Sequence, residues 1–83
     1  METRLGFVGL IVENRKSNAA AVNAVLSEFG DLILARTGIP CPENGCSAIT
    51  VVVRASTDEL GALTGKLGRL PGVAVKSMLS KAQ

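Results

Sequence analysis

Cys41 and Cys46 are the only cysteines of the 83-residue chain, and a Pro-Glu-Asn-Gly stretch separates them. If these four residues form the loop of a β-hairpin, the two thiols face each other across neighbouring strands. Opposed Cβ atoms in a pair without ladder hydrogen bonds lie about 4.5–5.5 Å apart, and a disulfide needs about 3.8 Å. A small adjustment of the backbone would therefore permit a reversible dithiol.

Three interpretations of this cysteine pair stay open at this point. The two residues are ordinary loop cysteines, or a redox sensor, or half of a metal or cluster site. A cytoplasm keeps most thiols reduced, which favours a labile disulfide over a persistent one. Two thiolates are too few for a four-coordinate zinc or iron–sulfur site, so a dimer would have to supply Cys41 and Cys46 twice.

The other reactive side chains do not form a catalytic set. The chain has no histidine, which excludes histidine acid–base catalysis and histidine-ligated metals. The hydroxyls of Ser17, Ser56 and Thr57 are placed to cap helices and lack a histidine partner. The carboxylates cannot be assigned as a pair to one cleft; they are Glu13, Glu43, Asp58 and Glu59. We therefore expect no catalytic residue and no enzymatic activity, and the sequence indicates no particular cofactor.

Length and composition predict one domain, residues 1–83, with a core of valine, leucine, isoleucine and alanine. No apolar run approaches the ~20 residues of a membrane span, and the N-terminal stretch lacks the features of a signal peptide. These observations favour a cytoplasmic protein. The net charge is only +2, with scattered lysines and arginines and no interleaved aromatics, so nucleic-acid binding by this domain alone is not supported. An assembled oligomer could still gather these charges into one patch.

Hydrophobic periodicity predicts strands at 4–13, 31–38, 48–54 and 73–79, with helices at 17–29 and 57–70. Ser17 is the expected N-cap of the first helix, and Ser56 with Glu59 forms a capping box for the second. The order is β-α-β-β-α-β. Right-handed crossovers then give an α+β, ferredoxin-like βαββαβ sandwich, a four-stranded antiparallel sheet with two helices on one face.

This arrangement leaves one face of the sheet without helices. The first strand is nevertheless apolar on both sides: Val8, Leu10 and Val12 alternate with Phe7 and Ile11. An open apolar face on a small domain predicts a contact surface. A homodimer that stacks or extends the sheets is the simplest way to cover it.

Three glycines form a second unusual feature, on the helix predicted at 57–70. Leu60, Leu63, Leu67 and Leu70 make one apolar stripe, and Gly61, Gly65 and Gly68 lie on nearly the opposite side. Each glycine costs about 1 kcal/mol relative to alanine in a helix interior. The stripe reflects either weak selection in a short, distorted helix or a smooth surface for close packing. We expect the glycines to contact another chain or a ligand.

The stretches GFVGLIVENR, LSEFGDLILARTGIP and TDELGALTGKLGRLPGVAVKS resemble the small regulators of the iron-only hydrogenase system, which are similar in fold to ACT domains. The resemblance covers nearly the whole chain and is most specific between residues 57 and 72. It implies a ferredoxin-like fold and homo-oligomers. It also implies a non-enzymatic regulatory role in anaerobes, in transcription or maturation of the hydrogenase, with an effector or partner at the subunit interface.

The resemblance to ACT domains also implies where a ligand would bind. ACT effectors commonly lie at a subunit interface near the loop between the first strand and the first helix, often beside an Asp-x-Pro-Gly-like turn. Here that loop, residues 13–18, lacks proline and glycine. It is either a solvated loop that caps a helix, or an anion site formed by the helix N-terminus with Asn14, Arg15, Ser17 and Asn18. The expected partners are a second copy, a small-molecule effector or a partner protein.

Overall fold

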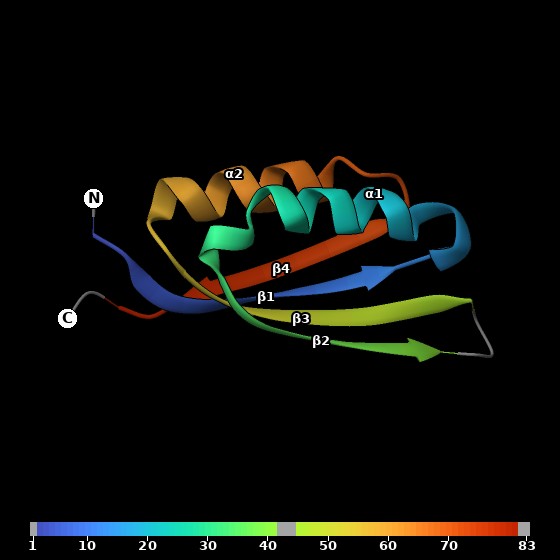
Figure 1. Ribbon diagram of the computed structural model, residues 1–83, viewed down its shortest axis with the longest axis horizontal. Helices are drawn as coiled ribbons and strands as arrows, with labels where there is room; N and C mark the ends of the chain where they lie inside the picture. The colour runs from blue at the N-terminus through green and yellow to red at the C-terminus, as the bar shows by residue number, and fades with distance from the viewer. Residues whose placement is uncertain (1, 42–44, 82–83) are drawn as a thin grey trace.

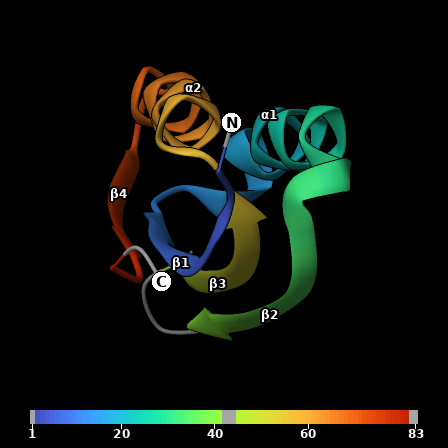
Figure 2. The ribbon, with the colours of Figure 1, turned by 90° about the vertical axis from the view of Figure 1, so that its left-hand side faces the viewer.

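The computed structural model describes residues 2–41 and 45–81 (Figure 1). Both helices cover the same face of one four-stranded antiparallel sheet, whose strand order is β2-β3-β1-β4 (Figure 2). This is the ferredoxin-like arrangement expected from the sequence. The elements in chain order are β1 (Arg4–Val12), α1 (Arg15–Glu28), the short 3-10 turn η1 (Gly30–Leu32), β2 (Ile33–Cys41), β3 (Cys46–Ala55), α2 (Thr57–Gly68) and β4 (Val73–Leu79).

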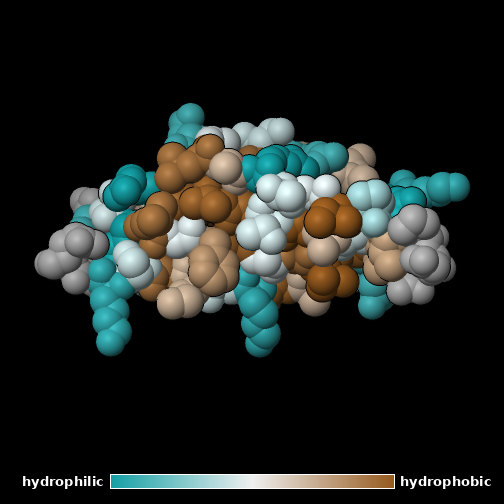
Figure 3. Space-filling view, turned by 90° about the horizontal axis from the view of Figure 1, so that it is seen from below, coloured by the Kyte–Doolittle hydropathy of each residue, from teal (hydrophilic) through white to brown (hydrophobic). Residues whose placement is uncertain are grey.

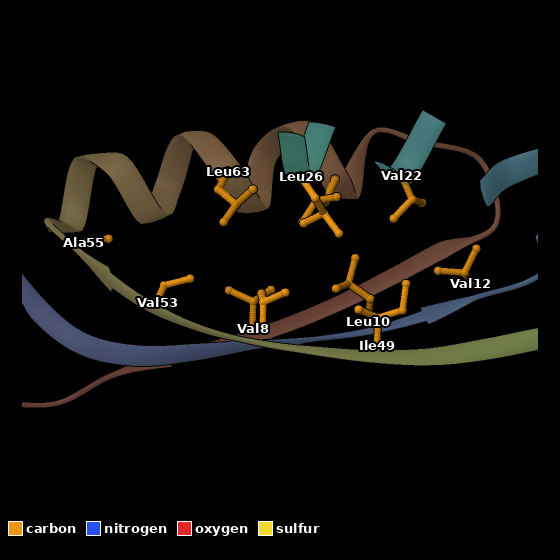
Figure 4. Packing of buried hydrophobic residues seen from close by; sticks show 11 residues of the cluster. Val8, Leu10, Val12, Val22, Leu26, Ile49, Val53, Ala55 and Leu63 are labelled. Carbon is orange, nitrogen blue, oxygen red and sulfur yellow. The ribbon is translucent and has the colours of Figure 1, made fainter. Parts of the chain in front are cut away.

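The central strand β1 divides its side chains between the two faces of the sheet. Val8, Leu10 and Val12 are at most 2% exposed and point toward the helices, where they meet Val22 of α1 and Leu63 of α2 in one core (Figure 4). Alternation in an extended strand sends the residues between them to the other face. The predicted division of this strand into two faces is therefore confirmed.

The start of α2 agrees with the sequence prediction. Ser56 Oγ accepts a hydrogen bond from the Glu59 backbone N–H at 3.1 Å, and the Glu59 carboxylate accepts one from the Ser56 N–H at 2.8 Å. This capping box satisfies two backbone donors that the helix leaves unpaired. It fixes the point where the chain turns from β3 into α2, so that the leucine stripe faces the sheet.

The prediction that Ser17 caps α1 is wrong. The helix begins at Arg15, and Asn14 precedes it in the left-handed region, with φ 50°. Ser17 lies in the first turn, where its hydroxyl donates to the Asn14 carbonyl at 3.1 Å. The local preference of serine for the cap position is overridden because the Glu13 N–H donates to the Gly72 carbonyl at 2.7 Å, a contact between distant parts of the chain.

Strands β2 and β3 extend further toward their hairpin than predicted, so that Cys41 and Cys46 end the two strands instead of lying in a longer loop. Pro40 is tolerated because β2 is an edge strand, where one row of backbone N–H groups has no partner strand. β2 lies away from α2 at the edge of the sheet (Figure 2). Most of its residues are exposed, although Arg36 Nη2 donates a hydrogen bond to Asn23 Oδ1 of α1 at 3.0 Å.

The sheet face opposite the helices is uncovered in the single chain. Phe7, Ile11 and Met78 remain 47%, 49% and 60% exposed there. Figure 3 shows this face, on which hydrophobic residues gather on either side of a less hydrophobic centre. Among the residues that the structure describes, no helix is long and apolar enough to cross a bilayer.

Candidate functional site

The loop between β1 and α1 is attached to the β2–β3 hairpin through one residue, Arg15. Its Nη1 donates to the carbonyls of Cys41, at 3.3 Å, and Cys46, at 3.0 Å. Its backbone N–H donates to the Gly45 carbonyl at 2.9 Å. We call these three hydrogen bonds the Arg15 clamp. Because a charged donor bonds to two carbonyls that end neighbouring strands, the clamp fixes the loop against the hairpin.

A second set of contacts holds the same loop against the turn between α2 and β4. The Asn18 side-chain amide donates to the Glu13 carbonyl at 2.6 Å, and the Glu13 N–H bonds to Gly72. Gly72 has φ 74°, and a Cβ there would lie 2.9 Å from Asn18 Nδ2. A glycine is therefore required at this position. The loop is anchored on both sides and is not merely a solvated connection.

A hollow of about 350 Å³ opens between this loop and the hairpin, lined by Asn14, Arg15, Lys16, Ser17 and Gly45. Three of the four residues predicted to bind a ligand thus meet in one place. Asn18 does not line the hollow, because its side chain bonds to the Glu13 carbonyl.

Sequence reasoning missed two residues of this hollow, Lys16 and Gly45. The charge of Lys16 beside Arg15 was visible in the sequence, but nothing there showed that Gly45 lies against the same loop. Arg15 and Lys16 bring two positive charges to the lining, and Arg15 Nη1 already bonds to two carbonyls. None of the described residues that line the hollow is acidic.

The two cysteines lie opposite each other at the end of the hairpin, as the dithiol hypothesis requires. Cys41 is the direct register partner of Cys46, and both are half-buried. No disulfide joins them in the described part of the chain. Glu43 and the rest of residues 42–44 lie outside the described residues. Within 2–41 and 45–81, no group of three or more histidine, cysteine or acidic residues could hold a metal ion.

The three glycines of α2 face away from the sheet. A Cβ built on Gly61, Gly65 or Gly68 would have no neighbour within 4 Å. Leu63 and Leu67, on the other side of the helix, are fully buried. The predicted direction of the glycine stripe is therefore confirmed, and its contact with another chain or a ligand stays a prediction.

The ferredoxin-like fold of this chain also occurs in two solved structures of low sequence identity. The ACT domain of a GTP pyrophosphokinase from Chlorobium tepidum superposes with a TM-score of 0.73 at 22% identity, over 92% of this chain and 99% of that domain. A nitrogen regulatory PII-like protein from Thiomonas intermedia K12, solved with ADP, AMP and bicarbonate, gives 0.52 at 14% identity, over 94% and 91%. At these identities the likeness is one of fold.

Sequence comparison identifies the family. Residues 4–77 match the TM1266-like family, described as "Iron-only hydrogenase system regulator, putative", and the chain belongs to this family. The structure of protein TM1266 from Thermotoga maritima is 38% identical, with a TM-score of 0.92, over 96% of this chain and all of that one. A search of curated proteins finds no match.

Proposed function

We propose that the chain is a cytoplasmic, non-enzymatic regulatory domain of the iron-only hydrogenase system. It acts as a homo-oligomer and responds to a small effector or to a partner protein bound near the interface between copies. Two findings support this proposal: the family is described as regulatory, and the same fold occurs in an ACT domain and in a PII-like regulator.

The observation that carries the effector proposal is the hollow beside the Arg15 clamp. Its loop is held on two sides before any ligand arrives, so binding does not require the backbone to become ordered. The hollow lies at the N-terminus of α1, where the helix dipole favours negative charge. Lys16 adds a full positive charge. A small anion is therefore the class of effector that this surface fits best.

This proposal predicts that selected anions raise the melting temperature of the protein. Suitable probes are inorganic phosphate, bicarbonate, ADP, AMP and free amino acids, the nucleotides and bicarbonate being ligands of the PII-like neighbour. A bound probe stabilises the folded state in proportion to the logarithm of its concentration above Kd. For the probe that binds, we expect Lys16→Ala to weaken binding about tenfold, as loss of one charged contact does. Titration calorimetry measures this ratio.

The matched control is Lys81→Ala, which removes an exposed lysine that follows the opposite end of β4. It should leave the Kd unchanged. A panel in which no probe raises the melting temperature contradicts the effector proposal. Equal losses from Lys16→Ala and Lys81→Ala would show that binding is non-specific charge attraction.

The register of Cys41 and Cys46 favours a second candidate function, a redox- or metal-sensing module. Oxidised glutathione is a suitable oxidant: each equivalent takes two electrons as the two thiols lose their protons and form one disulfide, leaving two reduced glutathiones. We expect anaerobically purified protein to titrate with two thiols, and oxidised protein with none. Peptide mapping should then show an intramolecular Cys41–Cys46 bridge.

Cys41→Ser and Cys46→Ser are the controls, since each retains one thiol and cannot form the internal bridge. Metal analysis of the same anaerobic sample tests whether two copies share an ion. Only mixed or intermolecular disulfides after oxidation, together with metal-free protein, would rule out this second function.

A further inference from the structure

We infer that a second copy of this chain covers the sheet face opposite the helices, so that two sheets pack face to face. The inference rests on the self-association in the proposed function and specifies its surface. We call this surface the open face. Strand register and alternation place the following residues on it: Leu5, Phe7, Gly9 and Ile11 of β1; Cys46, Ala48, Thr50, Val52 and Arg54 of β3; Ala35, Thr37, Ile39 and Cys41 of β2; and Ala74, Lys76 and Met78 of β4.

The size of the open face matches what a stable dimer needs. Four strands about 4.8 Å apart and about nine residues long at 3.3 Å per residue span roughly 19 by 30 Å. The flat area is on the order of 600 Å² per copy, and a corrugated side-chain surface exceeds its flat projection. Specific interfaces bury about 800 Å² per partner, with the smaller ones near 600 Å². The open face of a second copy therefore has the right area to cover this one.

The composition of the open face is that of an interface core. Phe7 and Met78 are register partners on β1 and β4 and stand about half-exposed, although Phe7 is one of only two aromatic residues in the chain. Aromatic residues and methionine are enriched in interfaces, and carboxylates are depleted. None of the residues assigned to the open face is acidic.

The two charged residues of the open face, Lys76 and Arg54, lie where they would stay in contact with solvent after a second copy binds. Lys76 is on the edge strand β4, so its aliphatic stem can lie along the sheet while the ammonium reaches water beside it. Arg54 is next to the last residue of β3. Stacking two copies therefore does not require either charge to be buried at the centre.

Gly9 gives the open face a shape that the single domain does not explain. A Cβ at this position would meet only the Lys76 carbonyl, at 4.0 Å, so the fold itself would accept a side chain. A hollow of about 310 Å³ lies over Gly9, bordered by Thr50, Lys76 and Ile11. An isolated glycine inside a strand weakens the strand, and it often marks a bulge or a close approach by another chain or ligand. The register of β1 is continuous at Gly9, so there is no bulge. A side chain such as Phe7 of a second copy would fill this hollow.

An isologous dimer explains both features with one surface. Two-fold symmetry brings the same patch of both copies together, so one chain supplies a protruding side chain and a hollow at once. Stacked sheets pack about 10 Å apart with interdigitated side chains. The half-exposed side chains beside Gly9 would form such an interdigitated layer.

Phe7→Lys tests this interface, with Ala20→Lys as its control. Ala20 is an exposed residue of α1, so the control adds the same charge to a surface away from the open face. Light scattering at about 100 μM protein should give the wild type twice its 8.6 kDa chain mass. Phe7→Lys should halve the mass, and Ala20→Lys should leave it unchanged. Circular dichroism reports whether each variant is folded.

Gly9→Val provides a second variant in case Phe7→Lys does not fold. Valine suits a strand and fills the hollow, so it should raise the dimer dissociation constant at least tenfold while the monomer stays folded. A monomeric wild type, or an unchanged mass in both open-face variants, overturns the inference. So does a mass halved only by Gly65→Arg, which would place the interface on the glycine stripe of α2.

Failure of this inference and failure of effector binding are separable. Lys16→Ala should remain a dimer, because Lys16 is not on the open face. A monomeric protein that still binds a probe anion would contradict the sheet-stacking interface and the self-association in the proposed function, but not the anion site. A dimer that binds no probe would contradict the effector site alone.

Discussion

Gly6→Ala should lower the free energy of unfolding by about 3 kcal/mol, as overpacking a tight site does. Gly6 is buried on the helix side of β1, where β1 and β4 pair. A Cβ there would overlap the Met78 carbonyl oxygen and lie 2.6 Å from Leu79 Cδ2. The oxygen belongs to the backbone, so relief requires the two strands to separate. Urea denaturation with linear extrapolation measures the loss.

Gly9→Ala is the matched control for this prediction. It makes the same change on the same strand but on the open face, where a Cβ would have one neighbour at 4.0 Å. We expect its monomer to be no less stable than the wild-type monomer. Both variants should be compared at one protein concentration, because self-association shifts apparent stability. Equal and small losses in both would contradict the close approach of β1 and β4 at Gly6.

Leu63→Ala should have an effect as large, about 2–5 kcal/mol, through lost burial and a residual cavity. Leu63 is fully buried between α2 and the sheet. The total stability of an 83-residue domain is of order 4–12 kcal/mol, so this one change removes a large part of it. The melting temperature should fall by about eight degrees or more on the scale of about 4–8 °C per kcal/mol.

The control for Leu63→Ala is Leu34→Ala. Leu34 is 58% exposed on the edge strand β2, so the same truncation leaves no enclosed cavity. Its effect should be below 1 kcal/mol. If Leu34→Ala were the more destabilising change, β2 would have to be covered by a second copy, and the loss would then depend on protein concentration.

The fold could be predicted from the sequence because the local residue patterns agree with one another. Val8, Leu10 and Val12 alternate with residues of the other face, and a two-residue period admits no other interpretation. Ser56 and Glu59 satisfy two backbone donors within one turn of α2. Such signals need no knowledge of distant parts of the chain, so patterns of residues alone could predict the elements and the sheet.

The candidate site could be predicted only in part from the sequence, because it depends on contacts between distant segments. Asn14 is the residue before α1, and not Ser17, since Glu13 is bonded to Gly72 almost sixty residues later. The role of Arg15 became visible only when the hairpin carbonyls were placed beside it. The sequence predicted a charged loop. It could not show that one charge holds the loop in place while Lys16 stays available.

The order in which the strands pair has a consequence for synthesis of the protein. β1 is made first, yet it becomes the centre of the sheet by pairing with β3 and β4. Val12 meets Ser47 and then Val73, so both partners of β1 are made much later. Until then a strand that is apolar on both sides has no partner, and unpaired apolar edges promote aggregation of nascent chains. The domain should therefore complete its fold only after β4 has left the ribosome, and should fold slowly for its size.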